Sequence, residues 1–149
     1  MEEKVEEVIR ILNKNLNCEA IILFGSYARK QQRPDSDIDI AFKSSRVISK
    51  QEIFDMTQSL EEILKKDVDL VDLNEISDSF RYEILMNGEI LYCKDNFQFD
   101  LYKLDMFREY LELNESRKSI IERVKNGGTI YGKWGNYIKQ IWKHRKMHP

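Results

Sequence analysis

Short apolar segments that alternate with amphipathic helical segments restrict the fold of this chain more than any other feature of its sequence. Residues 20–24 are apolar throughout, as in a buried strand, and residues 37–42 alternate between polar and apolar. By such patterns, strands are predicted at 20–24, 37–42, 68–73 and 89–93. Spacing and capping signals predict helices at 5–16, 49–64, 77–87 and 96–125. This order predicts an α/β or α+β domain with one sheet of about four strands and helices packed against it.

The predicted helix 49–64 has the clearest start signal in the chain. Ser49 followed three residues later by Glu52 forms the pattern of a capping box, in which each side chain accepts a hydrogen bond from the other residue's backbone. Six apolar residues then recur at helical spacing and are expected to face the core: Ile53, Phe54, Met56, Leu60, Ile63 and Leu64.

Composition excludes several classes of protein. The chain has 149 residues, of which 42% are hydrophobic and 34% charged, which is too apolar for disorder and too charged for a membrane protein. Its longest apolar run, 20–24, is far shorter than a membrane span, and its acidic first residues do not resemble a signal peptide. Two cysteines, Cys18 and Cys93, make no disulfide framework. We therefore expect a cytoplasmic protein.

The first candidate site element is Gly25-Ser26, directly after the buried strand at 20–24. Glycine lets the backbone turn sharply and lets a ligand approach closely. The serine hydroxyl and the free N–H groups of the turn that follows would together attract an anion. Gly-Ser is also common in ordinary turns, so this element alone does not establish a site.

The second element is the pair Asp37 and Asp39. At positions i and i+2 of a strand, both carboxylates project from the same face and repel each other unless a cation lies between them. Oxygen ligands of this kind suit Mg²⁺ or Mn²⁺. The alternative is a solvated strand end without any ligand.

The third element is the acidic strand at 68–73. Asp69 has apolar neighbours on both sides, so its carboxylate is expected in or beside a hydrophobic sheet, where it needs a metal, a donor or a catalytic role. Asp67 fits a loop at the start of the strand. Asp72 falls on the opposite face from Asp69 and is expected to face solvent, although the sequence does not fix the register and leaves Asp67 and Asp72 as alternatives for the third carboxylate.

The spacing of these elements is more specific than any one of them. Ten residues separate Gly25-Ser26 from Asp37-Ile38-Asp39, and an acidic strand follows later. The stretches 25–29 and 35–40, together with 68–71, resemble the signature of the minimal nucleotidyltransferases (MNT proteins) of the DNA polymerase β superfamily. The resemblance covers about residues 5–92 and implies a polymerase β-like nucleotidyltransferase fold with a small mixed sheet.

The resemblance also implies roles for individual residues in nucleotidyl transfer from ATP. Gly25 and Ser26 would hold the triphosphate, while Asp37 and Asp39 would bind two Mg²⁺ ions, with Mn²⁺ as an alternative. Asp69 would complete the metal site and help to deprotonate the attacking hydroxyl. Arg29, one turn past Ser26, is close enough to reach phosphate oxygens with its bidentate fork, and a surface salt bridge is its alternative role.

One residue departs from the family pattern. Where members often have glycine after the arginine, this chain has Lys30. If the helical turn continues there, lysine is tolerated and adds positive charge near the phosphates. If the position requires a positive φ, Lys30 strains the loop.

Size narrows the choice among nucleotidyltransferases, because the chain has no room for the extra domains of a polymerase. It resembles the antitoxin of HEPN/MNT toxin–antitoxin pairs, which implies transfer of AMP from ATP to a tyrosine of a HEPN ribonuclease toxin, within a hetero-oligomer. The alternatives are an antitoxin that only binds, and an aminoglycoside-type enzyme acting on a small molecule. Three intact carboxylates argue against the first, and the lack of a full helical domain argues against the second.

We expect three segments: a nucleotidyltransferase core (1–95), a helical segment that packs on the core or on a partner (96–126), and a basic aromatic tail (127–149). Nine Lys or Arg and one acidic residue lie between residues 117 and 149, in a chain of net charge −2. Basic residues interleaved with aromatic ones are found in proteins that bind single-stranded nucleic acid. For this tail, however, we favour a helix packed on the body of the protein or on a protein partner. No membrane contact is expected.

Overall fold

The computed structural model describes residues 2–33 and 36–115, and the chain divides into two compact units, Met1–Asp95 and Asn96–Pro149. The first unit contains α1 (Glu2–Leu16), β1 (Cys18–Phe24), α2 (Gly25–Ala28), β2 (Ile38–Ser44), α3 (Lys50–Leu64), β3 (Val68–Asp72), the 3₁₀ helix η1 (Leu73–Glu75), α4 (Asp78–Asn87) and β4 (Glu89–Cys93). The second contains α5 (Asn96–Glu115). Predictions for residues 116–149, including the basic aromatic tail, lie outside the described part.

The four strands of the first unit form one mixed sheet in the order β3-β2-β1-β4. Strand β1 is antiparallel to both β2 and β4, and β2 is parallel to β3. The predicted sheet of about four strands flanked by helices is therefore confirmed. Among the described residues, no helix is long and apolar enough to cross a membrane.

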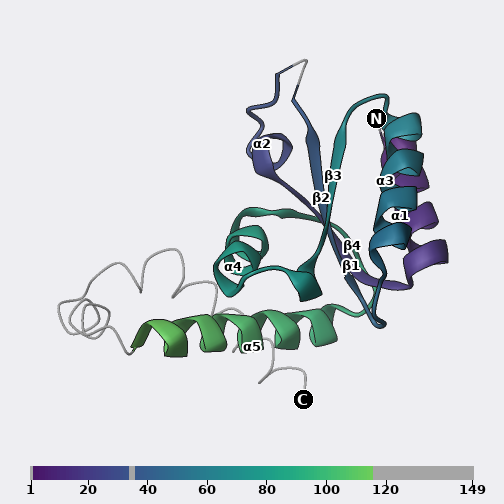
Figure 1. Ribbon diagram of the computed structural model, residues 1–149. Coiled ribbons are helices and arrows are strands. Elements are labelled where there is room, and N and C mark those ends of the chain that lie inside the picture. Colours follow the sequence, from purple (N-terminus) through teal and green to yellow (C-terminus); the bar gives the residue numbers. More distant parts are fainter. Residues whose placement is uncertain (1, 34–35, 116–149) are drawn as a thin grey trace. The chain divides into compact units, whose positions relative to one another are not determined.

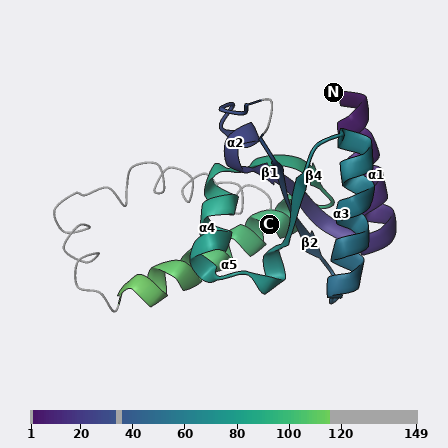
Figure 2. The same cartoon turned by 45° about the horizontal axis from the view of Figure 1, so that its top comes forward.

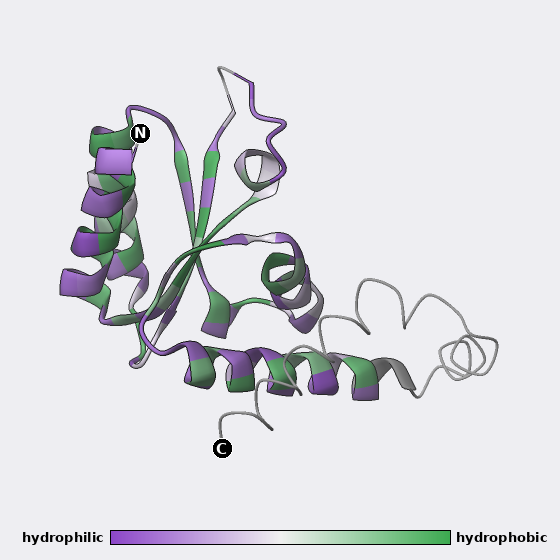
Figure 3. Cartoon of the chain, turned by 180° about the vertical axis from the view of Figure 1, so that it is seen from behind, coloured by the Kyte–Doolittle hydropathy of each residue, from purple (hydrophilic) through white to green (hydrophobic). Residues whose placement is uncertain are grey.

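Helices α1 and α3 cover one face of the sheet, while α2 and α4 lie on the other (Figures 1 and 2). Both covering helices carry hydrophilic residues on the side away from the sheet (Figure 3). The main core lies between them and the sheet, and its fully buried members include Leu12, Phe42 and Leu60. The expectation that Phe54 points into this core is wrong, because its side chain is 57% exposed.

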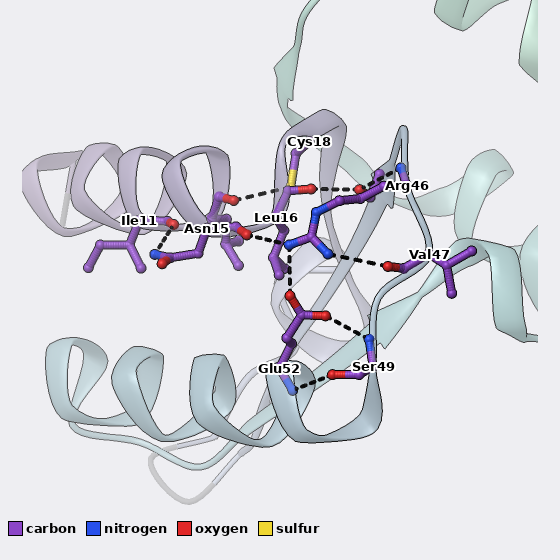
Figure 4. A network of polar contacts seen from close by, with 10 residues as sticks. Ile11, Asn15, Leu16, Cys18, Arg46, Val47, Ser49 and Glu52 are labelled. Carbon is purple, nitrogen blue, oxygen red and sulfur yellow. Dashed lines mark hydrogen bonds and ion pairs between the residues drawn. The ribbon is translucent and has the colours of Figure 1, made fainter.

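A polar network joins the end of α1 to the start of α3 (Figure 4). Arg46 donates hydrogen bonds to the carbonyl of Asn15 at 2.7 Å and to Glu52 at 2.8 Å. Ser49 and Glu52 form the capping box that the sequence predicts. The hydrogen bond from Arg46, and next the one from the Ser49 backbone, lower the pKa of Glu52 from 4.5 to about 2.

Replacing Glu52 by glutamine should therefore lower the free energy of unfolding at neutral pH. A carboxylate whose pKa is depressed by folding stabilises the protein above its unfolded pKa and loses that contribution as the pH falls through its folded pKa. The difference between wild type and Glu52→Gln should accordingly shrink between pH 4.5 and about 2. Urea unfolding of both proteins across this range tests the prediction, and a difference independent of pH would contradict it.

In the second unit, α5 carries a local cluster of one basic, one acidic and two aromatic residues. Lys103 lies 3.5 Å from Asp100, and its Nζ stands 4.9 Å from the centre of the Phe99 ring. Phe99 and Tyr102 stack with ring centres 6.0 Å apart. These contacts at spacings of three and four residues support the helix along one side.

Candidate active site

A row of three side chains crosses the sheet on the face opposite α1 and α3. In the parallel pair β2–β3, Asp39 is in register with Asp69, and in the antiparallel pair β1–β2 it is in register with Phe24. The alternate residues Ile38 and Ile40 belong to the core on the other face. Since facing residues of paired strands project to the same side, Asp69, Asp39 and Phe24 lie side by side.

Gly25 lies against Asp39, the middle residue of this row. It follows β1 with a φ of +71°, in the left-handed region that favours glycine. A Cβ atom built on Gly25 would lie 2.0 Å from Oδ2 of Asp39. The backbone of the Gly25-Ser26 turn therefore lies directly against the Asp39 carboxylate, at a separation that only glycine allows.

The electrostatics of the site centre on Asp39, which is half-buried. Burial raises the pKa of Asp39 above 3.8, and the charges of Asp69 and Asp37 raise it further. Arg29 acts in the opposite direction and lowers it. Three carboxylates and one guanidinium thus lie near one another, with the negative charges in excess.

Asp37 directly precedes β2, and both Asp37 and Asp69 are exposed. Among the described residues, no three His, Cys, Asp or Glu side chains converge closely enough to hold a metal ion by themselves. Because Asp37 and Asp69 are exposed, ligand atoms from outside the chain can reach their carboxylates.

Helix α2 is short and ends in a Schellman motif. The N–H of Gln31 donates to the carbonyl of Ser26 at 2.9 Å, and that of Lys30 donates to the carbonyl of Tyr27 at 3.2 Å. Lys30 has a φ of +55°, in the left-handed region. Of the two alternatives for this position, the one in which lysine strains the loop is therefore correct. Arg29 caps the helix and is exposed, close enough for its charge to act on Asp39.

Replacing Lys30 by glycine should stabilise the protein. The left-handed conformation costs a residue with a side chain about 1 kcal/mol or more, and glycine adopts it without that cost. We expect an increase of about 0.5–1 kcal/mol in the free energy of unfolding by urea, since glycine also has more freedom in the unfolded chain. A matched Lys50→Gly change, on a first-turn residue of α3, should destabilise instead. Loss of stability in Lys30→Gly would contradict the assignment.

The other two acidic residues near β3 lie outside the row. Asp67 is an exposed loop residue, as predicted, and its carbonyl accepts a hydrogen bond from the N–H of Ile38 at 2.9 Å. The expectation that Asp72 faces solvent is wrong, because it is buried on the face away from Asp69. There its Oδ1 accepts from the N–H of Asn74 at 2.9 Å and caps η1, which gives this buried acid a structural partner.

An aromatic pair at the edge of the site is not predictable from the sequence. The rings of Phe24 and Phe80 meet edge to face, with centres 5.7 Å apart and planes at 78°. Phe24 is predicted correctly as a strand residue, but nothing in the sequence places Phe80, from the start of α4, against it. Only the packing of α4 on β1 brings the two together.

Carboxylates that can bind metal ions, beside a tight glycine turn that can approach phosphates, suit phosphoryl-type transfer. The family model for "Polymerase beta, Nucleotidyltransferase" matches residues 6–97. The chain therefore belongs to the polymerase β nucleotidyltransferase family and has its fold.

Comparison with individual proteins gives more specific similarities than the family model does. The chain is 30% identical over 119 residues to the protein adenylyltransferase MntA of Shewanella oneidensis, covering 79% of this chain and 85% of MntA. It resembles a solved toxin–antitoxin structure with AMP-PNP at a TM-score of 0.71 and 30% identity, covering 81% of this chain and 98% of that one. It also resembles the MNT antitoxin structure solved in complex with the tri-AMPylated HEPN toxin of Shewanella oneidensis, with a TM-score of 0.66, 27% identity, and coverage of 83% of this chain and 98% of that one.

Proposed function

We propose that this protein is an antitoxin that transfers AMP from ATP to a tyrosine of a HEPN ribonuclease toxin and thereby neutralises it. The observation that carries the proposal is the row of Asp69 and Asp39 beneath the Gly25 turn. The relationship to MntA, a protein adenylyltransferase, and to the MNT antitoxin solved with its AMPylated toxin supports the same activity and partner.

In this proposal the Gly25-Ser26 turn and Arg29 bind the triphosphate. Gly25 brings the backbone against Asp39, so a phosphate bound at the turn would also lie beside the carboxylates. Arg29 is exposed on the same side and can contribute a bidentate contact to phosphate oxygens. These residues position the α-phosphate, and positioning supplies much of the rate in such transfers.

The acidic side chains fit a divalent cation. Asp37 and Asp39 would hold two Mg²⁺ ions, or Mn²⁺, with Asp69 completing the set, because burial and mutual repulsion raise the pKa of Asp39 and a cation would relieve both. Mg²⁺ is normally bound by one or two carboxylates together with substrate phosphates and waters rather than by a closed protein cage. The exposure of Asp37 and Asp69 leaves their carboxylates accessible to such phosphates and waters. When bound, the ions would neutralise charge on the phosphates.

The reaction would form one bond and break another at the α-phosphorus of ATP. The tyrosine oxygen of the toxin attacks, the bond to the bridging oxygen of the β-phosphate breaks, and pyrophosphate leaves with the electron pair. Asp69, exposed at the edge strand of the sheet, can accept the tyrosine proton. Its exposure leaves space for a protein acceptor, which is much larger than a small-molecule acceptor.

The segments beyond the core are proposed to serve the partner. Helix α5, within residues 96–126, and the basic aromatic tail, residues 127–149, would contact the core or the toxin. The positive charge of the tail would favour an acidic protein surface.

Intact mass spectrometry of the toxin tests this function. The full-length protein is incubated with the HEPN toxin, ATP and either Mg²⁺, Mn²⁺ or a chelator, and the ribonuclease activity of the repurified toxin is measured. We expect added AMP units on a toxin tyrosine, loss of ribonuclease activity that persists after repurification, and no modification with the chelator. Inhibition that disappears on separation, without any mass change, would instead indicate an antitoxin that acts by binding alone.

A further inference from the structure

The row of site residues ends at β1 in an aromatic surface. Phe80 is 38% exposed although it is a large apolar residue, and its ring meets that of Phe24 edge to face. An edge-to-face contact uses at most one face of the Phe80 ring, so another face is not taken up by this pair. Phe24 is itself the cross-strand neighbour of Asp39 and directly precedes Gly25.

The backbone around Phe80 is held firmly. The Ser77 hydroxyl caps α4 by accepting the N–H of Phe80 at 3.3 Å. Arg81 donates to the carbonyls of Leu73 at 2.8 Å and Ile76 at 3.1 Å, which ties the start of α4 to the segment before it. The ring is therefore carried by a fixed backbone, and a ligand that stacks on it would lose little free energy in ordering it.

Phe80 is not one of the buried core residues. The buried side chains of α4 are Ile84 and Leu85, in the second half of the helix, whereas Phe80 lies in its first turn and is exposed. Burial of an exposed phenylalanine is favourable, so an aromatic that remains exposed beside a site is available for a ligand.

The direction of a bound nucleotide follows from the topology. Strand β3 is an edge strand, so the sheet does not continue beyond Asp69. If phosphates lie at Asp39 and the Gly25 turn, the row continues along the sheet only toward Phe24, and neighbouring strands are about 4.8 Å apart. Helix α4 lies on this same face of the sheet as α2 (Figures 1 and 2). The ribose would thus carry the base toward α4.

We propose that the ring of Phe80 is the surface on which the base of the nucleotide substrate stacks, with Phe24 supporting it from behind. This inference rests on the proposed function, because it assumes that a nucleoside triphosphate binds at Asp39 and Gly25. Stacking on an aromatic ring recognises the flat face of a purine more strongly than that of a pyrimidine, because the purine offers more area. The Phe80 ring therefore favours ATP over CTP and UTP.

Calorimetry on the full-length protein with Mg²⁺ separates base from phosphate recognition. The probes are the non-hydrolysable analogue AMP-PNP and inorganic tripolyphosphate, which has neither base nor ribose. The proteins are wild type, Phe80→Ala, Phe80→Leu, which keeps apolar packing on Phe24 without a ring, and Phe80→Tyr, which keeps the ring. Phe54→Ala is the matched control, since it removes an exposed phenylalanine from α3 on the opposite face of the sheet.

We expect Phe80→Ala and Phe80→Leu to bind AMP-PNP about tenfold more weakly while tripolyphosphate binding stays unchanged. Phe80→Tyr and Phe54→Ala should match wild type with both probes. Unchanged AMP-PNP affinity in Phe80→Ala, or an equal loss for both probes, overturns the role of Phe80 and leaves the proposed function standing. A wild-type protein that binds neither probe overturns the proposed function, and the inference with it.

Discussion

Replacing Asp39 by asparagine is expected to abolish AMP transfer while making the metal-free protein more stable. The carboxylate is half-buried and lies near those of Asp69 and Asp37, so without a cation its charge is unfavourable in the folded state. Its loss removes a ligand from the proposed metal site, and transfer should fall about a thousandfold or more. Thermal unfolding in chelator and the rate of toxin modification measure the two effects.

The sign of the stability effect depends on pH. Folding raises the pKa of Asp39 above 3.8, so the ionised carboxylate destabilises the folded protein at neutral pH. The gain in Asp39→Asn should shrink as the pH falls through the raised pKa of the folded state, and it should be absent well below 3.8, where the wild-type carboxyl is protonated in both states. An unchanged or lower stability of Asp39→Asn at neutral pH in chelator would contradict the electrostatic account of the site.

Asp72→Asn is the matched control for Asp39→Asn. Burial also raises the pKa of Asp72, but this residue lies on the other face of the sheet, and the asparagine oxygen can still accept from the N–H of Asn74. Asp72→Asn should therefore keep wild-type transfer activity. If both variants lost activity alike, the loss would reflect disturbance of the sheet rather than of the site.

Replacing Gly25 by alanine is expected to have the second-largest effect. The added Cβ would fall 2.0 Å from Oδ2 of Asp39, and alanine would have to adopt a φ of +71°. The left-handed backbone conformation alone destabilises an alanine by about 1–2 kcal/mol. Either the turn or the carboxylate must move, and a displacement of about 1 Å at a reacting centre lowers the rate about a hundredfold. Urea unfolding and single-turnover transfer measure both consequences.

Gly88→Ala separates damage to the site from damage to the fold. A Cβ on Gly88 would lie 2.4 Å from Cγ2 of Ile22 and 2.6 Å from the carbonyl of Ile84, away from the carboxylates. This variant should lose stability but transfer AMP at the wild-type rate per folded molecule. A Gly25→Ala protein with wild-type transfer would show that the turn is not part of the site.

Much of the fold follows from local patterns in the sequence. The strand Glu89–Cys93 has the predicted bounds, and the Ser49–Glu52 capping box starts α3 where the sequence places it. These features depend on neighbouring residues, since periodicity and capping act over a few positions. The Gly25-Ser26 turn and the strand carrying Asp39 are predictable for the same reason.

The remaining features depend on contacts between distant segments. Whether Asp72 or Asp69 is covered depends on which face of the sheet the helices occupy, and a five-residue strand with one acid on each face does not fix this. Phe54 belongs to an apolar stripe that is wider than the surface available to α3. The approach of Gly25 to Asp39 and the Phe24–Phe80 pair arise only when strands and helices assemble.

The most direct test of the central claim is a transfer assay with ATP labelled at the α-phosphate. The full-length protein is incubated with its HEPN partner and Mg²⁺, beside an Asp37→Asn/Asp39→Asn variant that still forms the complex. The account predicts label on a toxin tyrosine with the wild type and none with the variant. A stable complex that blocks the ribonuclease but carries no label with either protein would contradict it.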